Sequence, residues 1–150
     1  MMENILCPVD FGRSSKRALK LATALASRCG AKVTLLHVLD SPPPHRGGVR
    51  LSTDMLERLG LRAQEYVSNL EAGPRLYVRL ATGSADQAIL EHIERSATDL
   101  IVMAADSHSG IRKLLLGSVT ERVLKYVSVP VLVVPNSTAG GSEDIEAPRT

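Results

Sequence analysis

The sequence predicts an α/β protein: a single doubly wound domain whose five-stranded parallel sheet carries helices on both faces. Five short apolar runs alternate with four amphipathic segments along the chain. Strands that are apolar throughout are typical of parallel sheets covered on both sides. Right-handed crossovers then limit the topology to doubly wound forms.

The first half of the chain contributes two strands and two helices. Residues 4–9 form an apolar run that is too short for a helix and suits a buried strand. From Ser14 to Cys29, apolar residues recur at three- and four-residue spacing, which predicts a helix that Gly30 ends. Residues 32–39 are the second expected strand. Residues 41–50, rich in Pro and Gly, are expected to be an irregular flap, followed by a helix over residues 56–70.

The second half repeats the alternation. Residues 75–80 alternate as a third strand, and Ser84 with Gln87 fits a capping box for a helix that runs to about Ser96. The remaining elements are a strand over residues 99–103, a helix over 118–127 and a strand over 129–134. Residues 136–150 lose this periodicity and are predicted to be a disordered tail, which leaves 1–135 as one domain.

Composition excludes several classes of protein. The 150 residues suit one domain, and 18 basic against 16 acidic residues give a net charge of +2, too balanced to indicate nucleic-acid binding. No run approaches the roughly 20 apolar residues of a membrane span, and no N-terminal signal is visible, so we expect a cytoplasmic protein without a membrane partner. Cys7 and Cys29 are expected to be buried free thiols rather than a disulfide.

The connection over residues 104–117 is the strongest functional candidate. Its fourteen residues are mostly small and polar, and loops longer than about 12 residues tend to be functional. Ser118 and Glu121 fit an S-x-x-E capping box, so a helix N-terminus with unpaired amides, which favours anions, follows the loop. Gly117 would let a phosphate approach the backbone. Further donors and positive charge come from Ser107, Ser109, Ser118, Arg112 and Lys113.

We place the site between this loop and the one at residues 8–15, because ligands of such sheets bind beyond the carboxyl ends of the strands where the strand order reverses. Asp10, after the first strand, could hydrogen-bond a ribose or base, or hold a cation. The competing interpretation is structural, since S-x-x-E caps many ordinary helices and loops are commonly polar.

Other chemistries lack their motifs. There is no G-x-x-x-x-G-K-[ST] phosphate loop and no G-x-G-x-x-G after the first strand. A response-regulator receiver would need more acids beside Asp10 and a Lys where Pro135 stands. The adjacent Asp106, Ser107 and His108 cannot align as a triad. Metal-ligand spacing is missing from the four histidines: His37, His45, His92 and His108.

Three stretches carry a resemblance to a known family: ILCPVDFGRSSKRAL, LLHVLD and DLIVMAADSHSGIRKLLLGSVTERVLKYVSVPVLVVP. Through them the chain resembles the universal stress proteins over nearly all of residues 4–135. The resemblance implies the adenine-nucleotide α-hydrolase-like fold and the strand order 3-2-1-4-5. The strand order then reverses between the first and fourth strands, where the loops had placed the site.

The nucleotide-binding branch of that family carries G-x2-G-x9-G-[ST] in the long loop. Gly117 and Ser118 match the end of this motif, whereas Ala104 and Ser107 replace its first two glycines. Each replacement costs little where φ is negative and about 1 kcal/mol where φ is positive. We therefore expect binding of ATP, with Mg²⁺, to be weakened or lost rather than excluded. The implied site residues are Pro8, Val9, Asp10, Val38, Met103, Ala104, Ala105, Ser107, Gly110, Gly117, Ser118 and Val119.

The family also forms homodimers through its last strand, which here would pair Val131, Leu132, Val133 and Val134. An exposed apolar edge strand needs a partner, although the tail could cover it instead. The leading hypothesis is a dimeric stress-response module that holds a nucleotide and acts on unknown protein partners. The alternatives are a nucleotide-independent interaction protein and a slow ATP hydrolase. The hydrolase is weakest, because Asp106 is its only candidate for a general base.

Overall fold

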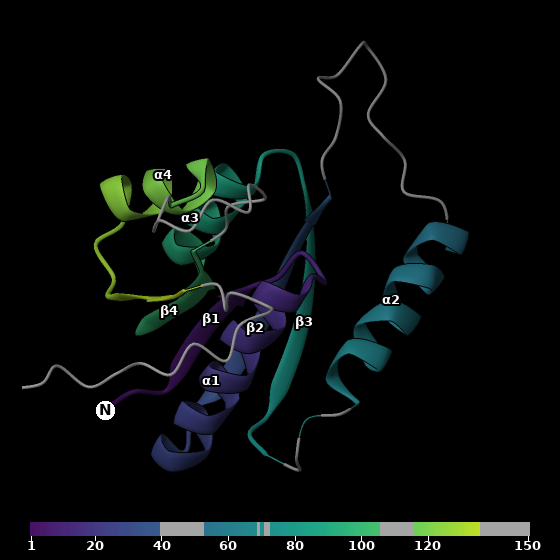
Figure 1. Ribbon diagram of the computed structural model, residues 1–150, viewed down its shortest axis with the longest axis horizontal. Coiled ribbons are helices and arrows are strands. Elements are labelled where there is room, and N and C mark those ends of the chain that lie inside the picture. The colour runs from purple at the N-terminus through teal and green to yellow at the C-terminus, as the bar shows by residue number, and fades with distance from the viewer. Residues whose placement is uncertain (40–52, 69, 71–72, 106–115, 136–150) are drawn as a thin grey trace, which may run out of the picture.

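A computed structural model describes residues 1–39, 53–68, 70, 73–105 and 116–135 (Figure 1). The described strands form one five-stranded sheet of order β3-β2-β1-β4-β5, and all neighbouring strands are parallel. The predicted fold class and strand order are therefore confirmed. The elements are β1 Asn4–Pro8, α1 Arg13–Cys29, β2 Lys32–Leu39, α2 Thr53–Val67, β3 Leu76–Thr82, α3 Ala85–Arg95, β4 Leu100–Ala104, α4 Ser118–Tyr126 and β5 Val131–Val134.

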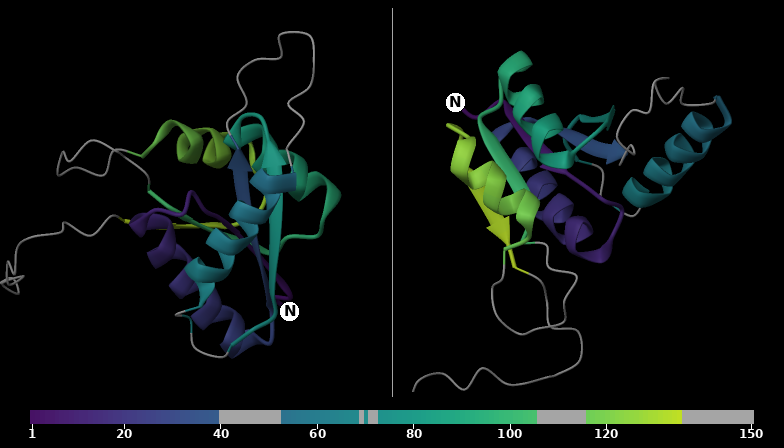
Figure 2. Two further views of the ribbon diagram at one scale, coloured as in Figure 1. Left: turned by 90° about the vertical axis from the view of Figure 1, so that its right-hand side faces the viewer. Right: turned by 90° about the horizontal axis from the view of Figure 1, so that it is seen from above.

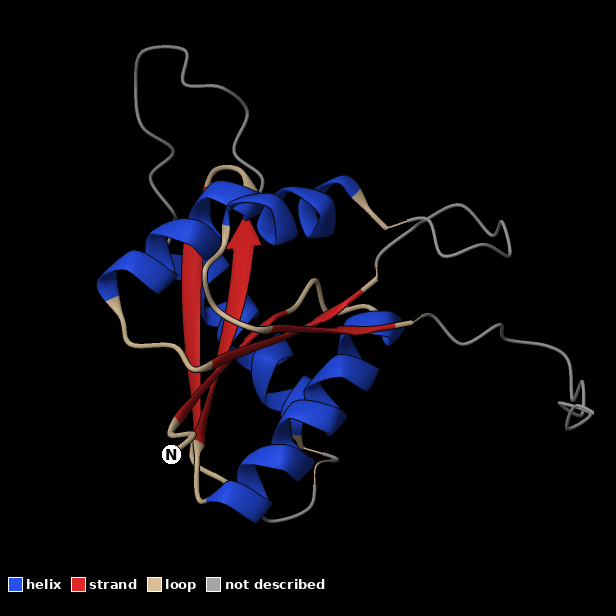
Figure 3. Ribbon diagram, turned by 90° about the vertical axis from the view of Figure 1, so that its left-hand side faces the viewer, coloured by secondary structure: helices blue, strands red, loops and turns tan. Residues whose placement is uncertain are grey.

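The helices cover both faces of the sheet (Figures 1 and 3). Alternate side chains along β1 enter two separate cores, because successive residues of a strand point to opposite faces. Ile5 and Cys7 belong to the core under α1, whereas Leu6 belongs to the core under α3 and α4. Figure 2 shows α4 and β5 at one end of the molecule and α2 at the other.

The centre of the sheet is the best buried part of the chain. Ile5, Leu6 and Cys7 are at most 1% exposed, since β1 has a strand on each side and helices on each face. Burial raises the pKa of the Cys7 thiol to about 12, so this cysteine stays protonated and unreactive. Cys29 is also a free thiol but is exposed, so the expectation of burial was wrong for it. It is the last residue of α1, just before the left-handed Gly30 that ends the helix.

Two predicted capping boxes do not form. Gly117 rather than Ser118 is the N-cap of α4, and no side chain caps that helix. Ser84 does occupy the N-cap of α3, but its hydroxyl makes no capping hydrogen bond. The last strand starts at Val131 instead of residue 129, because Pro130 has no N–H to add to a ladder. The Pro130 carbonyl still accepts a hydrogen bond from the Ile101 N–H at 2.9 Å.

Three expectations fall on residues outside the described ranges: the flap at 41–50, most of the long loop and the tail at 136–150. The tail and the domain boundary at residue 135 therefore stay predictions. Among the helices that the structure describes, none combines the length and apolarity needed to cross a membrane.

Asp99 fixes the start of β1 against the turn that precedes β4. Its carboxylate accepts the backbone N–H groups of Glu3 and Asn4 at 2.8 and 2.9 Å. These hydrogen bonds lower the pKa of Asp99, that from Glu3 contributing most. A carboxylate with a lowered folded-state pKa stabilises the fold above its unfolded pKa of about 3.9, and the contribution is lost as the pH falls through the folded-state value.

We therefore predict that Asp99→Asn lowers the melting temperature at pH 7 and that the difference from wild type shrinks as the pH falls below about 4. Thermal unfolding followed by circular dichroism at a series of pH values measures this difference. A deficit that stays constant down to pH 3 would show that the ionised carboxylate is not the stabilising form.

Candidate functional site

A cavity of about 250 Å³ opens at the carboxyl ends of β1, β2 and β4, between α3 and α4. It lies where the strand order reverses, since β1 continues into α1 on one face of the sheet and β4 leads to α4 on the other. Its lining combines aliphatic side chains with one carboxylate and three hydroxyls. The residues are Pro8, Val9, Asp10, Ser14, Ser15, Leu36, Val38, Ala85, Ile89, Met103, Ala104, Val119 and Thr120.

The cavity brings together seven of the predicted site residues: Pro8, Val9, Asp10, Val38, Met103, Ala104 and Val119. Ala105 is buried after β4, and its N–H donates to the Val134 carbonyl at 2.9 Å. Gly117 and Ser118 stand at the start of α4, outside the cavity lining. Ser107 and Gly110 lie outside the described residues.

Asp10 is held in one orientation by its own loop. Its Oδ1 atom accepts hydrogen bonds from the Gly12 N–H and the Ser15 hydroxyl, both at 2.7 Å. The Asp10 N–H in turn donates to Ser15 Oγ at 3.2 Å. A side chain on Gly12 would disturb this turn, since a Cβ there would lie 2.8 Å from Asp10 Oδ1. The carboxylate therefore reaches the cavity already positioned.

A residue far along the chain completes this network. Tyr66, on α2, lies 2.9 Å from Ser15 Oγ, and its hydroxyl donates to the Gly12 carbonyl at 3.1 Å. Burial raises the pKa of Tyr66 to about 12, so the phenol stays neutral and keeps its proton for these bonds. Ser15 is itself buried, which makes each bond costly to leave unmade. Through Tyr66, helix α2 supports the loop that carries Asp10.

Phe11 stores strain in the same loop. It is the only non-glycine residue of the described part with a positive φ, 62°, a conformation that costs about 1–2 kcal/mol. Its ring lies 4.3 Å from His37 and meets Tyr66 edge-on at 5.3 Å. The Arg62 guanidinium covers the Phe11 ring at 5.1 Å. These aromatic and cation–π contacts offset the strain.

His37 has a structural role. Its Nδ1 atom donates to the Val9 carbonyl at 2.9 Å, and its ring packs at a tilt of 41° against the Phe11 ring. Both contacts tie β2 to the segment that follows β1.

The structure shows the backbone conformation of Ala104, which replaces the first glycine of the family motif. It is the last residue of β4, pairs in register with Val134 and does not have a positive φ. Alanine therefore causes no backbone strain at this position. The Thr120 hydroxyl donates to the Ala104 carbonyl at 3.1 Å, which anchors the first turn of α4 on the strand. The remaining effect of alanine in place of glycine is one additional methyl group at the cavity wall.

Six lining residues were not named as site residues from the sequence, although two of them lie in the loop over 8–15 where the site was placed. They are Ser14, Ser15, Leu36, Ala85, Ile89 and Thr120. Leu36 could have been found, because it lies two residues before Val38 and shares its face of β2. Ile89 could have been found too, because it lies four residues after Ala85 on the same face of α3. The hydroxyls of Ser15 and Thr120 gave no signal, since their partners become neighbours only through the fold.

The arrangement suits binding rather than covalent chemistry. Aliphatic walls accept a flat apolar ring, a fixed carboxylate accepts hydroxyl or amino donors, and the partly positive N-terminus of α4 favours a nearby anion. Among the described residues, no group of three or more His, Cys, Asp or Glu gathers as a metal site.

Known proteins resemble this chain in sequence and in fold. Universal stress protein MJ0531 of Methanocaldococcus jannaschii is 33% identical over 140 residues, which cover 89% of this chain and 82% of the relative. The solved structure of MJ0577, from the same organism, aligns with a TM-score of 0.74 at 28% identity and covers 93% of this chain and 99% of that one. The universal stress protein of Archaeoglobus fulgidus in complex with dAMP shares the fold, with a TM-score of 0.65 at 21% identity, covering 89% and 97%. The sequence model described as "Universal stress protein family" matches residues 1–135, and this chain belongs to that family.

Proposed function

We propose that this chain is a stress-response binding module that holds an adenine nucleotide in the cavity between β1 and β4. The observation that carries the proposal is the cavity itself, in which an aliphatic slot meets a carboxylate fixed by Ser15 and Gly12. The complex of the Archaeoglobus fulgidus protein with dAMP, in the same fold, supports an adenine nucleotide as the ligand.

The residues present fit such a ligand. Leu36, Val38 and Met103 would enclose the base, and Asp10 would accept hydrogen bonds from ribose hydroxyls or the base amino group. The cavity volume of about 250 Å³ lies just below the roughly 300–1,000 Å³ of typical ligand pockets. The phosphates would therefore extend beyond it toward the amides at the start of α4. A divalent cation such as Mg²⁺ would accompany those phosphates.

We predict that the protein binds AMP and ATP and that Gly117→Val weakens ATP binding by at least about tenfold, or 1.4 kcal/mol. Gly117 has φ of −61°, so valine fits the backbone and acts mainly by blocking approach to α4. Isothermal titration calorimetry with AMP and with ATP, each with and without Mg²⁺, measures the affinities. Only the triphosphate is expected to gain from Mg²⁺.

Ala104→Gly is the matched control, because it restores the glycine of the family motif without strain in the strand. It should bind ATP at least as tightly as wild type. No heat with either nucleotide at millimolar concentration would refute the proposal and favour a nucleotide-independent interaction protein. Binding that Gly117→Val leaves unchanged would place the phosphates elsewhere.

Ser15→Ala tests the support of Asp10. The variant leaves the Asp10 N–H and carboxylate without their shared partner, so we expect the free energy of unfolding to fall by about 1–2 kcal/mol and AMP affinity to fall with it. Urea unfolding and calorimetry measure the two effects. Ser27→Ala, on the exposed side of α1, should change neither. If Ser15→Ala is destabilised but binds AMP as tightly as wild type, the hydrogen bonds around Asp10 do not contribute to ligand binding.

The proposal includes a homodimer formed through β5. Among the described strands, β5 pairs only with β4, and Leu132 is 37% exposed. An apolar edge of this kind is a template for pairing with a second copy.

We predict a light-scattering mass of about twice the 16.1 kDa of the monomer at micromolar concentration. Leu132→Lys should return the mass to that of the monomer, because a charge on an edge strand opposes pairing. Leu61→Lys, on the exposed face of α2, is the control and should remain dimeric. A monomeric wild type would refute pairing through β5.

A further inference from the structure

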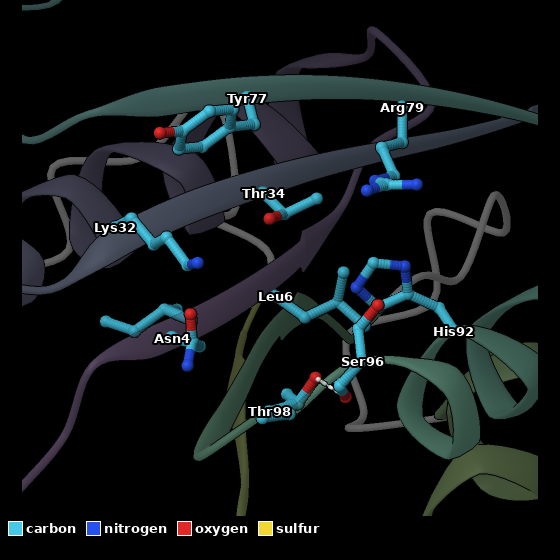
Figure 4. A pocket seen from close by; sticks show the side chains of 11 residues that line it. Asn4, Leu6, Lys32, Thr34, Tyr77, Arg79, His92, Ser96 and Thr98 are labelled. Atoms are coloured by element: carbon cyan, nitrogen blue, oxygen red, sulfur yellow. Dashed lines mark hydrogen bonds between the residues drawn. The ribbon is translucent and has the colours of Figure 1, made fainter.

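A second cavity lies at the opposite end of the sheet, near the starts of β1, β2 and β3 (Figure 4). Its volume is about 290 Å³, and the last turn of α3 forms one of its walls. We call it the basic groove and define it by Lys32, Thr34, Tyr77, Arg79 and His92. Figure 4 shows Lys32 and Tyr77 toward one end of this space and Arg79 and His92 toward the other, with Thr34 between them.

The alternation of β2 and β3 leaves the floor of the groove polar. Lys32 and Thr34 share the face that carries Leu36, and Thr34 pairs in register with Tyr77. Val33 and Leu35, on the other face of β2, are fully buried. Packing therefore explains the apolar face of β2 but not its polar one. Tyr77 remains 47% exposed.

Within the described part of the chain, no ion pair joins Lys32 or Arg79 to a carboxylate. Among the described residues, the ion pairs join Arg58 to Asp54 and Arg122 to Asp86, both away from the groove, and no Asp or Glu lines it. The Lys32 ammonium lies 5.9 Å from the centre of the Tyr77 ring, in a cation–π contact.

The His92 ring and the carboxyl end of α3 also affect the electrostatic potential of the groove. Burial, and then the charge of Arg79, lower the pKa of His92, so at neutral pH its ring is uncharged and offers one N–H. The carboxyl end of α3 carries about half a negative charge, which opposes an anion but is outweighed by two full cations. Glu3, Glu91 and Asp99 each stand next to a lining residue in the sequence, but none of them lines the groove. The Asp99 carboxylate accepts the backbone N–H groups of Glu3 and Asn4.

We propose that the basic groove binds a small phosphomonoester. The Arg79 guanidinium suits a tetrahedral dianion, because Arg can bind two of its oxygens at once, and the Lys32 ammonium adds positive charge along the groove. The Thr34 hydroxyl adds a neutral donor on the floor. The volume exceeds what a lone oxyanion fills, and the exposed face of Tyr77 offers a surface for an organic substituent. The ligand class is thus a phosphate ester with a compact, ring-bearing or aliphatic body.

The test uses phenyl phosphate and inorganic phosphate as probes, with amide chemical shifts in NMR to locate each one. We expect both to shift the resonances of Lys32, Thr34 and Arg79, and phenyl phosphate to bind more tightly than inorganic phosphate. Arg79→Gln should weaken phenyl phosphate binding by at least about tenfold, as expected for losing charge-assisted hydrogen bonds. Lys32→Gln should weaken it as well.

Arg28→Gln, on α1 across the sheet, makes the same change of net charge and should leave the affinity unaltered. Gly117→Val should also leave it unaltered, which separates the groove from the proposed nucleotide site. Equal weakening by Arg28→Gln would reduce the effect to net charge and overturn the proposal. Chemical-shift changes confined to Asp10 and Val38 would also overturn the proposal. The absence of any shift at about 10 mM probe would do the same, because that concentration is some ten times a millimolar dissociation constant.

Discussion

The burial of β1 on all sides is the constraint on which the rest of the structure depends. A strand with neighbours on both edges and helices on both faces must be apolar throughout, and Ile5, Leu6 and Cys7 are almost completely buried. Because β2 and β4 flank it, the connections from β1 and β4 leave for opposite faces of the sheet. The crevice between them opens where both strands end, so Asp10 is the first residue after β1 that can face solvent.

The loop after β1 is held in one conformation by hydrogen bonds from Gly12 and Ser15 to the Asp10 carboxylate. Phe11 is strained, yet the strain is local and the surrounding ring contacts and hydrogen bonds over-determine the loop. A carboxylate fixed before the ligand arrives loses little entropy when it binds. Since Tyr66 supplies part of this order from α2, a helix remote from the cavity contributes to the site without touching it.

Sequence patterns predicted the elements well because local periodicity follows from burial. Every helix and strand was expected, and the errors concern their ends. Helix α2 runs over Thr53–Val67 instead of 56–70, and β5 starts after Pro130. Strand order came only from resemblance to a family, because crossover rules leave several doubly wound orders open. The pairing of Ser15 with Tyr66, 51 residues apart, had no sequence signal at all. Ala104 was identified as a replaced glycine from the sequence. The free-energy cost of that replacement depends on the φ angle at this position, which only the fold determines.

The two cavities differ because the two ends of a parallel sheet differ. At the carboxyl ends, the loops carry Asp10 and the start of α4, so an aliphatic slot lies near a carboxylate and a helix N-terminus. At the amino ends, no helix begins, and a pocket for an anion must take its charge from side chains. Lys32 and Arg79 supply that charge from positions on β2 and β3 that packing leaves free. Two chemically distinct sites can therefore coexist on one small sheet, since neither uses the groups that build the other.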